Sequence, residues 1–324
     1  MNIVITGGSG FIGTHLVKLL LDEGHSVRIF DKRPSEAYPD LVTLGDVRDE
    51  TAMTSAFQGA DAVYHLAAEH HDDVRPLSLY YEVNAGGAER LAAACEANDV
   101  KRIIFTSTSA VYGLDEGETD ESSPITPFND YGKSKLQAEQ IFLEWVKKGD
   151  GRSLFMVRPV VVFGEGNTAN VYNLIKQVAG GRFVMVGSGE NKKSMAYVGN
   201  LVLLLAQVLS RDSQGEIVNY ADKPDLSVAE IVDVIRDELG QSSTPLRRLP
   251  YWLGMLGGYG FDVLARLRNR KYTISSIRIK KFCASTQVAT RVFKDLDFEA
   301  PYSLDEGLRR MIASIPGEEL TGTH

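Results

Sequence analysis

A tyrosine and a lysine four positions apart, Tyr131 and Lys135, are the residues of this sequence best suited to acid/base chemistry. Residues spaced by four lie on one face of an α-helix, so this spacing would bring a phenol beside an ammonium. A free phenol, whose pKa is about 10, is a poor base at neutral pH. A neighbouring positive charge favours the phenolate and lowers that pKa, so the pair predicts a tyrosine that transfers protons.

Three glycines near the N-terminus have a spacing that suits a bound dinucleotide. They follow a short apolar run at residues 3–5, which we expect to be a buried parallel strand, and they open a helical pattern. Glycines let the backbone turn tightly and approach phosphates, while a helix N-terminus offers N–H groups and a positive dipole end. Together with Tyr131 and Lys135, this loop predicts a redox enzyme. The expected contacts are Gly7, Gly10, Phe11, Ile12 and Gly13.

The second expected strand, residues 26–30, ends at Asp31. An acid about 20 residues after the glycine loop is placed to bind the ribose hydroxyls of a dinucleotide. Its carboxylate would repel a 2′-phosphate, which favours NAD over NADP. Lys32 and Arg33 follow directly and could accept such a phosphate, so both also count as candidate cofactor contacts.

Further candidate cofactor contacts lie where expected strands end, because a parallel sheet binds its ligands at that edge. Asp46 and Val47 would hold an adenine edge. Asn84 opens an expected helix and is either its N-cap or a cofactor contact. The chain after residue 65 carries small side chains, as a close approach to a cofactor requires. The candidates are Asp46, Val47, Leu66, Ala67, Ala68 and Asn84.

Apolar runs and helical patterns alternate from the N-terminus to about residue 162. This alternation predicts an α/β fold, a doubly wound parallel sheet of the Rossmann type. Beyond residue 164 the elements are mixed and richer in glycine, which predicts a smaller α/β substrate domain. We expect an NAD-binding domain at 1–163, a mainly substrate-binding domain at 164–316 with segments that return to the first, and a disordered tail at 317–324. The expected strands are 3–5, 26–30, 42–44, 62–66, 102–106 and 154–157, and the expected helices include 85–98 and 133–147.

The composition is that of an ordinary globular protein of 324 residues. Its two cysteines, Cys95 and Cys283, argue against a disulfide framework, have no metal-site spacing, and fit a reducing cytoplasm. The net charge of −8 argues against nucleic acid as the main partner. We expect no signal peptide before the first strand and no metal, and no apolar run reaches the roughly 18 residues of a membrane span.

One segment departs from this overall acidity. Between Pro245 and Phe282, nine basic residues accompany a single acid, Asp262. An apolar and aromatic stretch at residues 251–267 lies inside it, and such a stretch with basic flanks could lie in a membrane interface and attract anionic headgroups. The candidate membrane-contacting region is 251–271. The simpler interpretation, which we prefer on the sequence, is a buried helix of the substrate domain with solvated basic neighbours.

The glycine loop and the tyrosine–lysine pair belong to a series of motifs that runs in order along nearly the whole chain. Together these motifs resemble those of the extended short-chain dehydrogenases/reductases, the NAD-dependent sugar-nucleotide epimerase and dehydratase family. The other matching segments are Asp46-Val47, His65-Leu-Ala-Ala68, Val83-Asn84, Thr106-Ser-Thr-Ser-Ala-Val-Tyr-Gly113 and Arg158-Pro-Val-Val-Val-Phe-Gly164.

This resemblance implies roles for particular residues. Tyr131 would be the acid/base group, and Lys135 would also bind the nicotinamide ribose. Thr108, at the family's Ser/Thr position, would donate a hydrogen bond to the reacting sugar oxygen, with Ser107 and Ser109 as rivals. Pro159 would contact the cofactor.

Residues 67–73, 194–200 and 280–284 resemble one branch of this family, which acts on N-acetylglucosamine carried by undecaprenyl diphosphate, an O-antigen precursor. The resemblance implies a 4-epimerase that interconverts GlcNAc and GalNAc by transient oxidation at C4, with NAD kept bound. We expect a homodimer in the cytoplasm, peripheral on the inner face of the cell membrane. The candidate substrate contacts are Glu69, His70, Ser109, Asn170, Lys193 and Arg278, of which Lys193 and Arg278 would face the diphosphate.

Other functions use the same residues. A 4-epimerase of UDP-GlcNAc or UDP-glucose is one alternative, and a 4-keto reductase that consumes NAD(P)H on a nucleotide deoxysugar is another. The joint presence of Thr108, Tyr131 and Lys135 argues against a non-catalytic dinucleotide-binding protein. A dehydratase is disfavoured because that branch has Asp-Glu after the threonine, where this chain has Ser109-Ala110.

Overall fold

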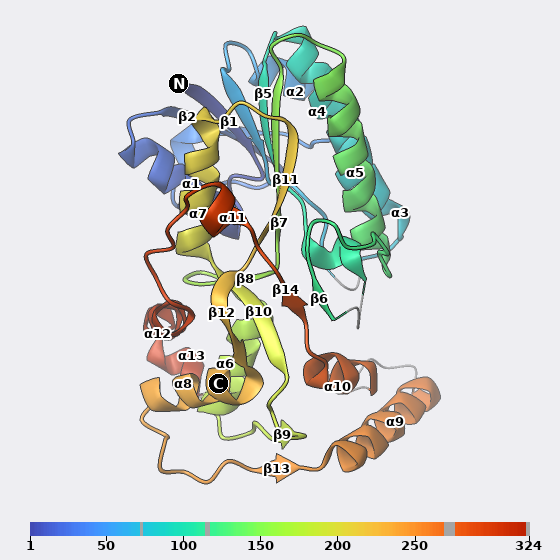
Figure 1. Ribbon diagram of the computed structural model, residues 1–324, viewed down its shortest axis with the longest axis vertical. Helices are drawn as coiled ribbons and strands as arrows, with labels where there is room; N and C mark the ends of the chain where they lie inside the picture. Colours follow the sequence, from blue (N-terminus) through green and yellow to red (C-terminus); the bar gives the residue numbers. More distant parts are fainter. Residues whose placement is uncertain (72–73, 114–116, 269–275, 322–324) are drawn as a thin grey trace. The chain divides into compact units, whose positions relative to one another are not determined.

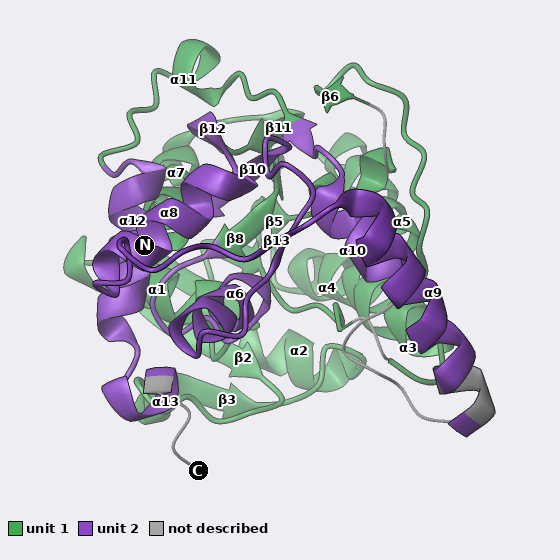
Figure 2. Ribbon diagram, turned by 90° about the horizontal axis from the view of Figure 1, so that it is seen from below, with its two compact units in different colours: residues 1–162, 198–221, 288–301 green, residues 163–197, 222–287, 302–324 purple. Residues whose placement is uncertain are grey.

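The computed structural model describes residues 1–324 except 72–73, 114–116, 269–275 and 322–324. The chain forms two compact units, each built from three separate segments (Figure 2). The first unit contains residues 1–162, 198–221 and 288–301, and the second contains residues 163–197, 222–287 and 302–324. Segments after residue 164 therefore join the first unit at 198–221 and 288–301.

The first unit is built on a seven-stranded sheet in the order β11-β7-β5-β4-β1-β2-β3, in which every neighbouring pair is parallel (Figure 1). The predicted doubly wound parallel sheet is thereby confirmed. Its strands are β1 (Asn2–Thr6), β2 (Ser26–Asp31), β3 (Val42–Leu44), β4 (Ala62–His65), β5 (Arg102–Thr106), β7 (Ser153–Pro159) and β11 (Gln214–Tyr220).

The central strands form because both of their faces are covered. Every residue of β4 and β7 is buried, as are four of the five residues of β5. A parallel sheet covered on both faces selects continuous apolar runs, which is why these strands were visible in the sequence.

Helices cover the two faces of this sheet (Figure 1). On one face α1 (Phe11–Asp22) packs against α7 (Val198–Gln207). On the other lie α2 (Glu50–Ala56), α4 (Gly86–Ala97) and α5 (Asp130–Lys147). Helix α5 begins three residues before its predicted start. The remaining elements of this unit are α3 (Ser78–Tyr80), a π-helical turn (Tyr81–Ala85), 3-10 turns (Pro39–Leu41, Ser109–Tyr112, Val208–Ser210), β6 (Glu118–Thr119) and α11 (Val292–Asp295).

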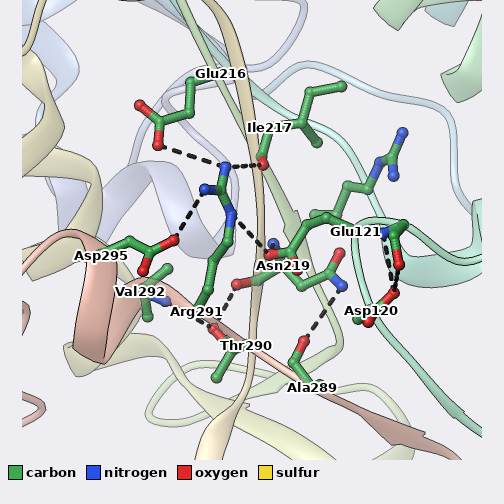
Figure 3. Close-up of polar contacts among 12 residues, drawn as sticks. Asp120, Glu121, Glu216, Ile217, Asn219, Ala289, Thr290, Arg291, Val292 and Asp295 are labelled. Carbon is green, nitrogen blue, oxygen red and sulfur yellow. Dashed lines mark hydrogen bonds and ion pairs between the residues drawn. The ribbon is translucent and has the colours of Figure 1, made fainter.

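Segment 288–301 is held to the edge strand β11 by polar contacts (Figure 3). The guanidinium of Arg291 donates to the carbonyl of Ile217 at 3.0 Å and to the carboxylate of Asp295 at 3.0 Å. The hydroxyl of Thr290 donates to the carbonyl of Asn219 at 2.7 Å. These bonds to β11 explain why a segment so late in the sequence returns to the first unit.

The second unit mixes short strands and helices. Strands β10 (Lys192–Tyr197) and β12 (Asp222–Ser227) pair antiparallel, and β9 (Met185–Val186) and β13 (Arg248–Leu249) pair parallel. Its helices are α6 (Asn170–Ala179), α8 (Val228–Glu238), α9 (Tyr251–Arg268), α10 (Ser276–Cys283), α12 (Leu304–Ser314) and α13 (Gly317–Thr321). Strands β8 (Val161–Phe163) and β14 (Gln287–Val288) lie where the chain passes from one unit to the other.

Two expectations for this unit are corrected. The tail expected to be disordered contains α13, whose first turn has Glu318 and Glu319 at the positive end of the helix dipole. The side chain of Glu319 also accepts a hydrogen bond from the Tyr172 hydroxyl. The stretch preferred as a buried helix is α9, and four of its large apolar side chains, Trp252, Leu256, Tyr259 and Val263, are more than half exposed.

In the described part of the chain, α9 and the other helices are too short or too polar to cross a bilayer. The side chain of Arg266 and the whole of Arg270 and Lys271, which belong to the candidate membrane-contacting region, lie outside the described residues.

Candidate active site

Helix α5 carries the tyrosine–lysine pair. The side chain of Asn129 caps this helix by accepting a hydrogen bond from the Gly132 N–H at 2.8 Å. Tyr131 therefore lies in the first turn of α5, and Lys135 lies one turn later, as their spacing predicts. Sequence reasoning missed Asn129, although an asparagine just before an acidic first turn is a known start signal.

Thr108 lies two residues beyond β5, and its side chain is close enough to the Tyr131 phenol to lower the pKa of that phenol. Its hydroxyl oxygen also accepts from the Ala110 N–H at 3.1 Å, which fixes the turn after the strand. The rival Ser107 is buried and donates to Glu139 at 2.5 Å, so its only hydroxyl proton is already used. Ser109 is partly exposed at the start of the next turn. The geometry favours Thr108 as the partner of Tyr131.

Burial changes the acidity of both members of the pair. It raises the pKa of Tyr131 above its ordinary value of 10.0, and the hydrogen bond from Thr108 opposes that rise. It lowers the pKa of Lys135 to about 7, while the negative charge of Glu139 opposes that fall. In the chain without its cofactor, burial therefore disfavours the charged forms of both groups.

A buried network of polar groups lies one turn beyond Lys135. The guanidinium of Arg158 forms two hydrogen bonds with the Glu139 carboxylate, at 2.8 and 2.6 Å. It also donates to the Tyr112 hydroxyl at 2.8 Å, and that hydroxyl donates to the Asn219 side chain at 2.7 Å. The Lys135 ammonium lies over the Phe105 ring, 4.2 Å from its centroid. This network fixes the position and local charge of the helix face that holds Lys135.

Asn84 connects the loop after β4 to the tyrosine–lysine helix. Its side-chain oxygen accepts from the Glu69 N–H at 2.8 Å, and its amide donates to the Glu69 carbonyl and the Ser134 hydroxyl, both at 2.9 Å. The Ser134 hydroxyl in turn donates to the Tyr131 carbonyl at 2.9 Å. Asn84 lies inside the π-helical turn, so its expected role as an N-cap is wrong. Because both amide hydrogens are used within the chain, Asn84 positions the surrounding backbone.

The glycine loop is shaped to receive a phosphate. A Cβ atom on Gly7, whose φ is +76°, would lie 2.5 Å from the Ala67 nitrogen, and one on Gly13 would lie 2.6 Å from the Gly7 oxygen. A Cβ atom on Gly10 would meet only that same oxygen, at 3.2 Å, among the described atoms within 4 Å. Gly10 is the N-cap of α1, and the first turn of that helix contains no acid. The residues present thus fit an anionic pyrophosphate.

Asp31 lies beside this loop and is buried. Its carboxylate accepts from the Ser9 N–H at 3.1 Å and from the Arg33 N–H at 3.0 Å. Lys32 forms an ion pair with Glu69, with 3.7 Å between the ammonium and the carboxylate. The structure therefore brings together four residues predicted for the site, Asp31, Lys32, Arg33 and Glu69. The Lys32 ammonium is paired with a carboxylate of the chain itself.

The remaining predicted cofactor contacts lie at strand ends. The Asp46 carboxylate binds the Arg48 guanidinium at 3.0 and 2.8 Å, which lowers the pKa of Asp46. Val47 is buried, and its side chain packs against Gly87 of α4, where a Cβ atom would lie 3.1 Å from a Val47 carbon. The Leu66 N–H donates to the Thr6 carbonyl at 3.0 Å, which brings this loop beside β1. Ala68 is partly exposed in that loop, and Pro159 is the buried last residue of β7.

The predicted substrate contacts divide between the units. Glu69 and the exposed His70 belong to the first unit, and the His70 ring stacks on His71 with centroids 4.5 Å apart. In the second unit, the Lys193 ammonium donates to the carbonyls of Lys281 and Ala284, at 3.0 and 2.5 Å. It thus holds the C-terminal end of α10, the helix on which Arg278 is exposed. Asn170 is the exposed first residue of α6.

Comparison with known proteins gives consistent matches. A model of the NAD dependent epimerase/dehydratase family matches residues 3–221. The N-acetyl-alpha-D-glucosaminyl-diphospho-ditrans,octacis-undecaprenol 4-epimerase of Escherichia coli O157:H7 is 49% identical to this chain, over 96% of this chain and 94% of its own length. The UDP-glucose 4-epimerase of Vibrio cholerae is 31% identical, over 82% and 85% of the two chains.

Among solved structures, MoeE5 in complex with UDP-glucose and NAD aligns with a TM-score of 0.77 at 26% identity. The alignment covers 97% of this chain and 98% of MoeE5. The family model includes the glycine loop, Thr108 and the tyrosine–lysine helix, and it spans more than half of the sequence. This chain therefore belongs to the NAD-dependent epimerase/dehydratase family.

Proposed function

We propose that this chain is an NAD-dependent 4-epimerase that interconverts GlcNAc and GalNAc on undecaprenyl diphosphate. The observation that carries this proposal is the 49% identity, over nearly the full length of both chains, to a 4-epimerase of that lipid-linked sugar. The site supports it, because Tyr131 at the start of α5, with Thr108 near its phenol, would supply the acid/base group that oxidation at C4 requires.

The residues of the chain would bind and orient the cofactor. The glycine loop and the N-terminus of α1 would hold the pyrophosphate, and Asp31 would accept hydrogen bonds from ribose hydroxyls. Lys135 would bind the nicotinamide ribose. The Lys32–Glu69 ion pair favours NAD, because a carboxylate already accompanies the cation that a 2′-phosphate would need. Bound NAD would supply the hydride acceptor, and then the hydride donor, for C4 of the sugar.

Tyr131 would move the proton in both halves of the reaction. As phenolate it removes the proton of the sugar 4-hydroxyl while the C4–H bond breaks, which leaves a ketone. Thr108 would donate its hydrogen bond to that oxygen. After the sugar turns its other face, Tyr131 returns the proton as the C4–H bond forms again. Lys135 and the positive nicotinamide ring would together lower the phenol pKa.

We assign the sugar and the diphosphate to the remaining polar residues. Glu69, His70 and Ser109 would contact the sugar. Arg278 and Asn170 would approach the diphosphate. Lys193 would support Arg278 through its bonds to the end of α10, in addition to any direct phosphate contact.

The decisive experiment measures product without added nucleotide. Protein purified in nucleotide-free buffer is incubated with GlcNAc-diphospho-undecaprenol or with UDP-GlcNAc, and released sugars are separated to quantify GalNAc. We expect turnover of the lipid-linked sugar without NAD(P)H, and NAD in the supernatant after denaturation. A 4-keto reductase would leave both sugars unchanged, because neither contains a ketone to reduce, and it would instead consume NAD(P)H stoichiometrically with a 4-keto nucleotide deoxysugar. Equal or faster turnover of UDP-GlcNAc would establish a nucleotide-sugar epimerase, the alternative that the Vibrio cholerae relative supports.

Asp31→Ala should weaken NAD binding by roughly 1.5–3 kcal/mol, the usual worth of a hydrogen bond to a charged group. Isothermal titration of nucleotide-free protein measures this directly. Asp31→Asn is the matched control, because its amide oxygen still accepts one loop N–H while the charge is lost, so an intermediate loss is expected. If Asp31→Ala binds NAD as tightly as the unmodified chain, Asp31 is not a ribose contact.

We further propose that the product is an O-antigen precursor and that the enzyme is a homodimer that works at the cytoplasmic face of the membrane. A lipid-linked sugar supports this location, because the polyprenyl chain stays in the bilayer while the sugar reaches Tyr131.

A further inference from the structure

Helix α9 presents small residues to its neighbours. A Cβ atom on Gly254 would lie 2.5 Å from a side-chain carbon of Val186, on β9. A Cβ atom on Gly258 would lie 2.8 Å from the Cα atom of Ser276, the first residue of α10. The two glycines are four residues apart and lie on one face, so they allow α9 to pack closely against β9 and α10 (Figure 1, Figure 2).

Several large apolar residues of α9 lie on its exposed side, whereas Met255, Phe261 and Leu264 are partly buried. Trp252, Leu256, Tyr259 and Val263 are 62%, 60%, 57% and 56% exposed. Their spacing of four, three and four residues places them in one stripe along the helix. We refer to these four residues as the α9 stripe. A helix usually buries its large apolar residues, so a continuous stripe of four exposed ones indicates a surface that another apolar phase covers.

The charges near the α9 stripe favour an anionic partner. Arg248 and Arg268 are exposed at or near the two ends of α9, and Arg278, Lys280 and Lys281 are exposed on α10. The one acid of this region, Asp262, accepts a hydrogen bond from the Ser276 hydroxyl at 2.5 Å. This concentration of positive charge contrasts with the net charge of −8 of the whole chain.

We propose that the α9 stripe docks this chain on an anionic lipid bilayer, with α9 lying in the plane of the interface. Trp252 and Tyr259 are the side-chain types that prefer the level of the headgroups, while Leu256 and Val263 would enter the acyl boundary. The basic residues around them would attract anionic headgroups and would lose that attraction in high salt. The inference rests on the proposed function, because a lipid-linked substrate requires the enzyme at a membrane.

The two tryptophans of the chain make this docking directly measurable. Trp145 is 2% exposed in the core of the first unit, whereas Trp252 belongs to the α9 stripe. The variant Trp145→Phe therefore carries only the reporter Trp252. Vesicles with about one third phosphatidylglycerol should shift its emission to the blue, and brominated acyl chains should quench it. Pure phosphatidylcholine vesicles, or 1 M salt, should weaken the shift at least several-fold. An unchanged spectrum with anionic vesicles overturns the proposal.

Sedimentation of the unmodified chain with the same vesicles provides a second measurement that does not depend on the Trp145→Phe variant. The joint replacement Leu256→Ser, Tyr259→Ser and Val263→Ser should reduce the bound fraction at least tenfold. The matched control is Leu44→Ser, since Leu44 is 63% exposed on β3, and it should bind like the unmodified chain. Equal loss in the control would overturn the assignment to α9.

The competing occupant of the α9 stripe is a second copy of this chain. Sedimentation velocity without lipid distinguishes the two, because a dimer that the serine replacements dissociate would overturn the membrane proposal. The docking measurements use no substrate, so their outcome is independent of the proposed reaction. Vesicle binding without epimerisation would refute the function alone, and epimerisation of the lipid-linked sugar without vesicle binding would refute the docking alone.

Discussion

Tyr131→Phe is expected to lower turnover by about 10²–10⁴-fold, the usual contribution of a positioned acid/base group. The phenol is the group to which we assign the proton transfer, and phenylalanine keeps the aromatic ring in the first turn of α5. The variant should fold normally and retain bound NAD, because the glycine loop and Asp31 are untouched. Turnover is measured as GalNAc formed per minute, and cofactor content by absorbance after denaturation.

Tyr81→Phe is the matched control for this experiment. The Tyr81 hydroxyl also contacts the start of the helix, donating to the Asp130 carboxylate at 2.8 Å, but it has no place in the proton transfer. Its removal should leave turnover close to that of the unmodified chain. If both variants lose activity equally, the loss reflects a disturbed helix start, and if neither loses activity, Tyr131 is not the acid/base group.

Glu139→Gln should destabilise the fold by about 3–5 kcal/mol, the usual result of removing one partner of a buried ion pair. Glu139 and Arg158 have side chains only 2% and 5% exposed, so the Arg158 charge would remain buried without its counter-ion. Urea unfolding, followed by circular dichroism, measures the loss in the free energy of unfolding.

Two further variants identify the cause of that loss. Replacing both partners by methionine should recover part of the lost stability, since the Arg158 charge is then removed together with its counter-ion. Glu144→Gln, on the same helix, removes an exposed partner of Lys147 and should cost no more than about 1 kcal/mol. A Glu139→Gln variant as stable as Glu144→Gln would contradict the role given to the buried pair.

The fold could be predicted from the sequence because each pattern that indicates it, an apolar run or a motif spacing, lies within a few consecutive residues. Residues 3–5 and 103–105 form continuous apolar runs, and strands buried on both faces need such runs. The tyrosine–lysine pair and the glycine spacing were readable for the same reason, since α5 and the first βα turn each fix their own geometry within a few residues.

The hydrogen-bond partners of Asn84 and Glu139 could not be predicted, because they are far from these two residues in the sequence. Asn84 binds Glu69 and Ser134, 15 and 50 residues away, and a helix-start pattern gave no sign of either. Glu139 carried a usable signal, as an acid four residues after Lys135 on the same face. The exposure of the α9 stripe could not be predicted, because apolar residues usually indicate burial and the helix has glycines on more than one face; only the contacts of Gly254 and Gly258 identify the face that packs inward.

The chain passes between its two units five times, after residues 162, 197, 221, 287 and 301. A fragment ending at residue 162 would lack α7, which packs on α1, and β11, which pairs with β7. Strand β7 would then become an unprotected edge, which invites aggregation. The cofactor half is therefore not a separable module. Transfer of substrate specificity between relatives would need residues 163–197, 222–287 and 302–324 exchanged together, so homologous recombination at a single junction would yield chimeras that fold poorly.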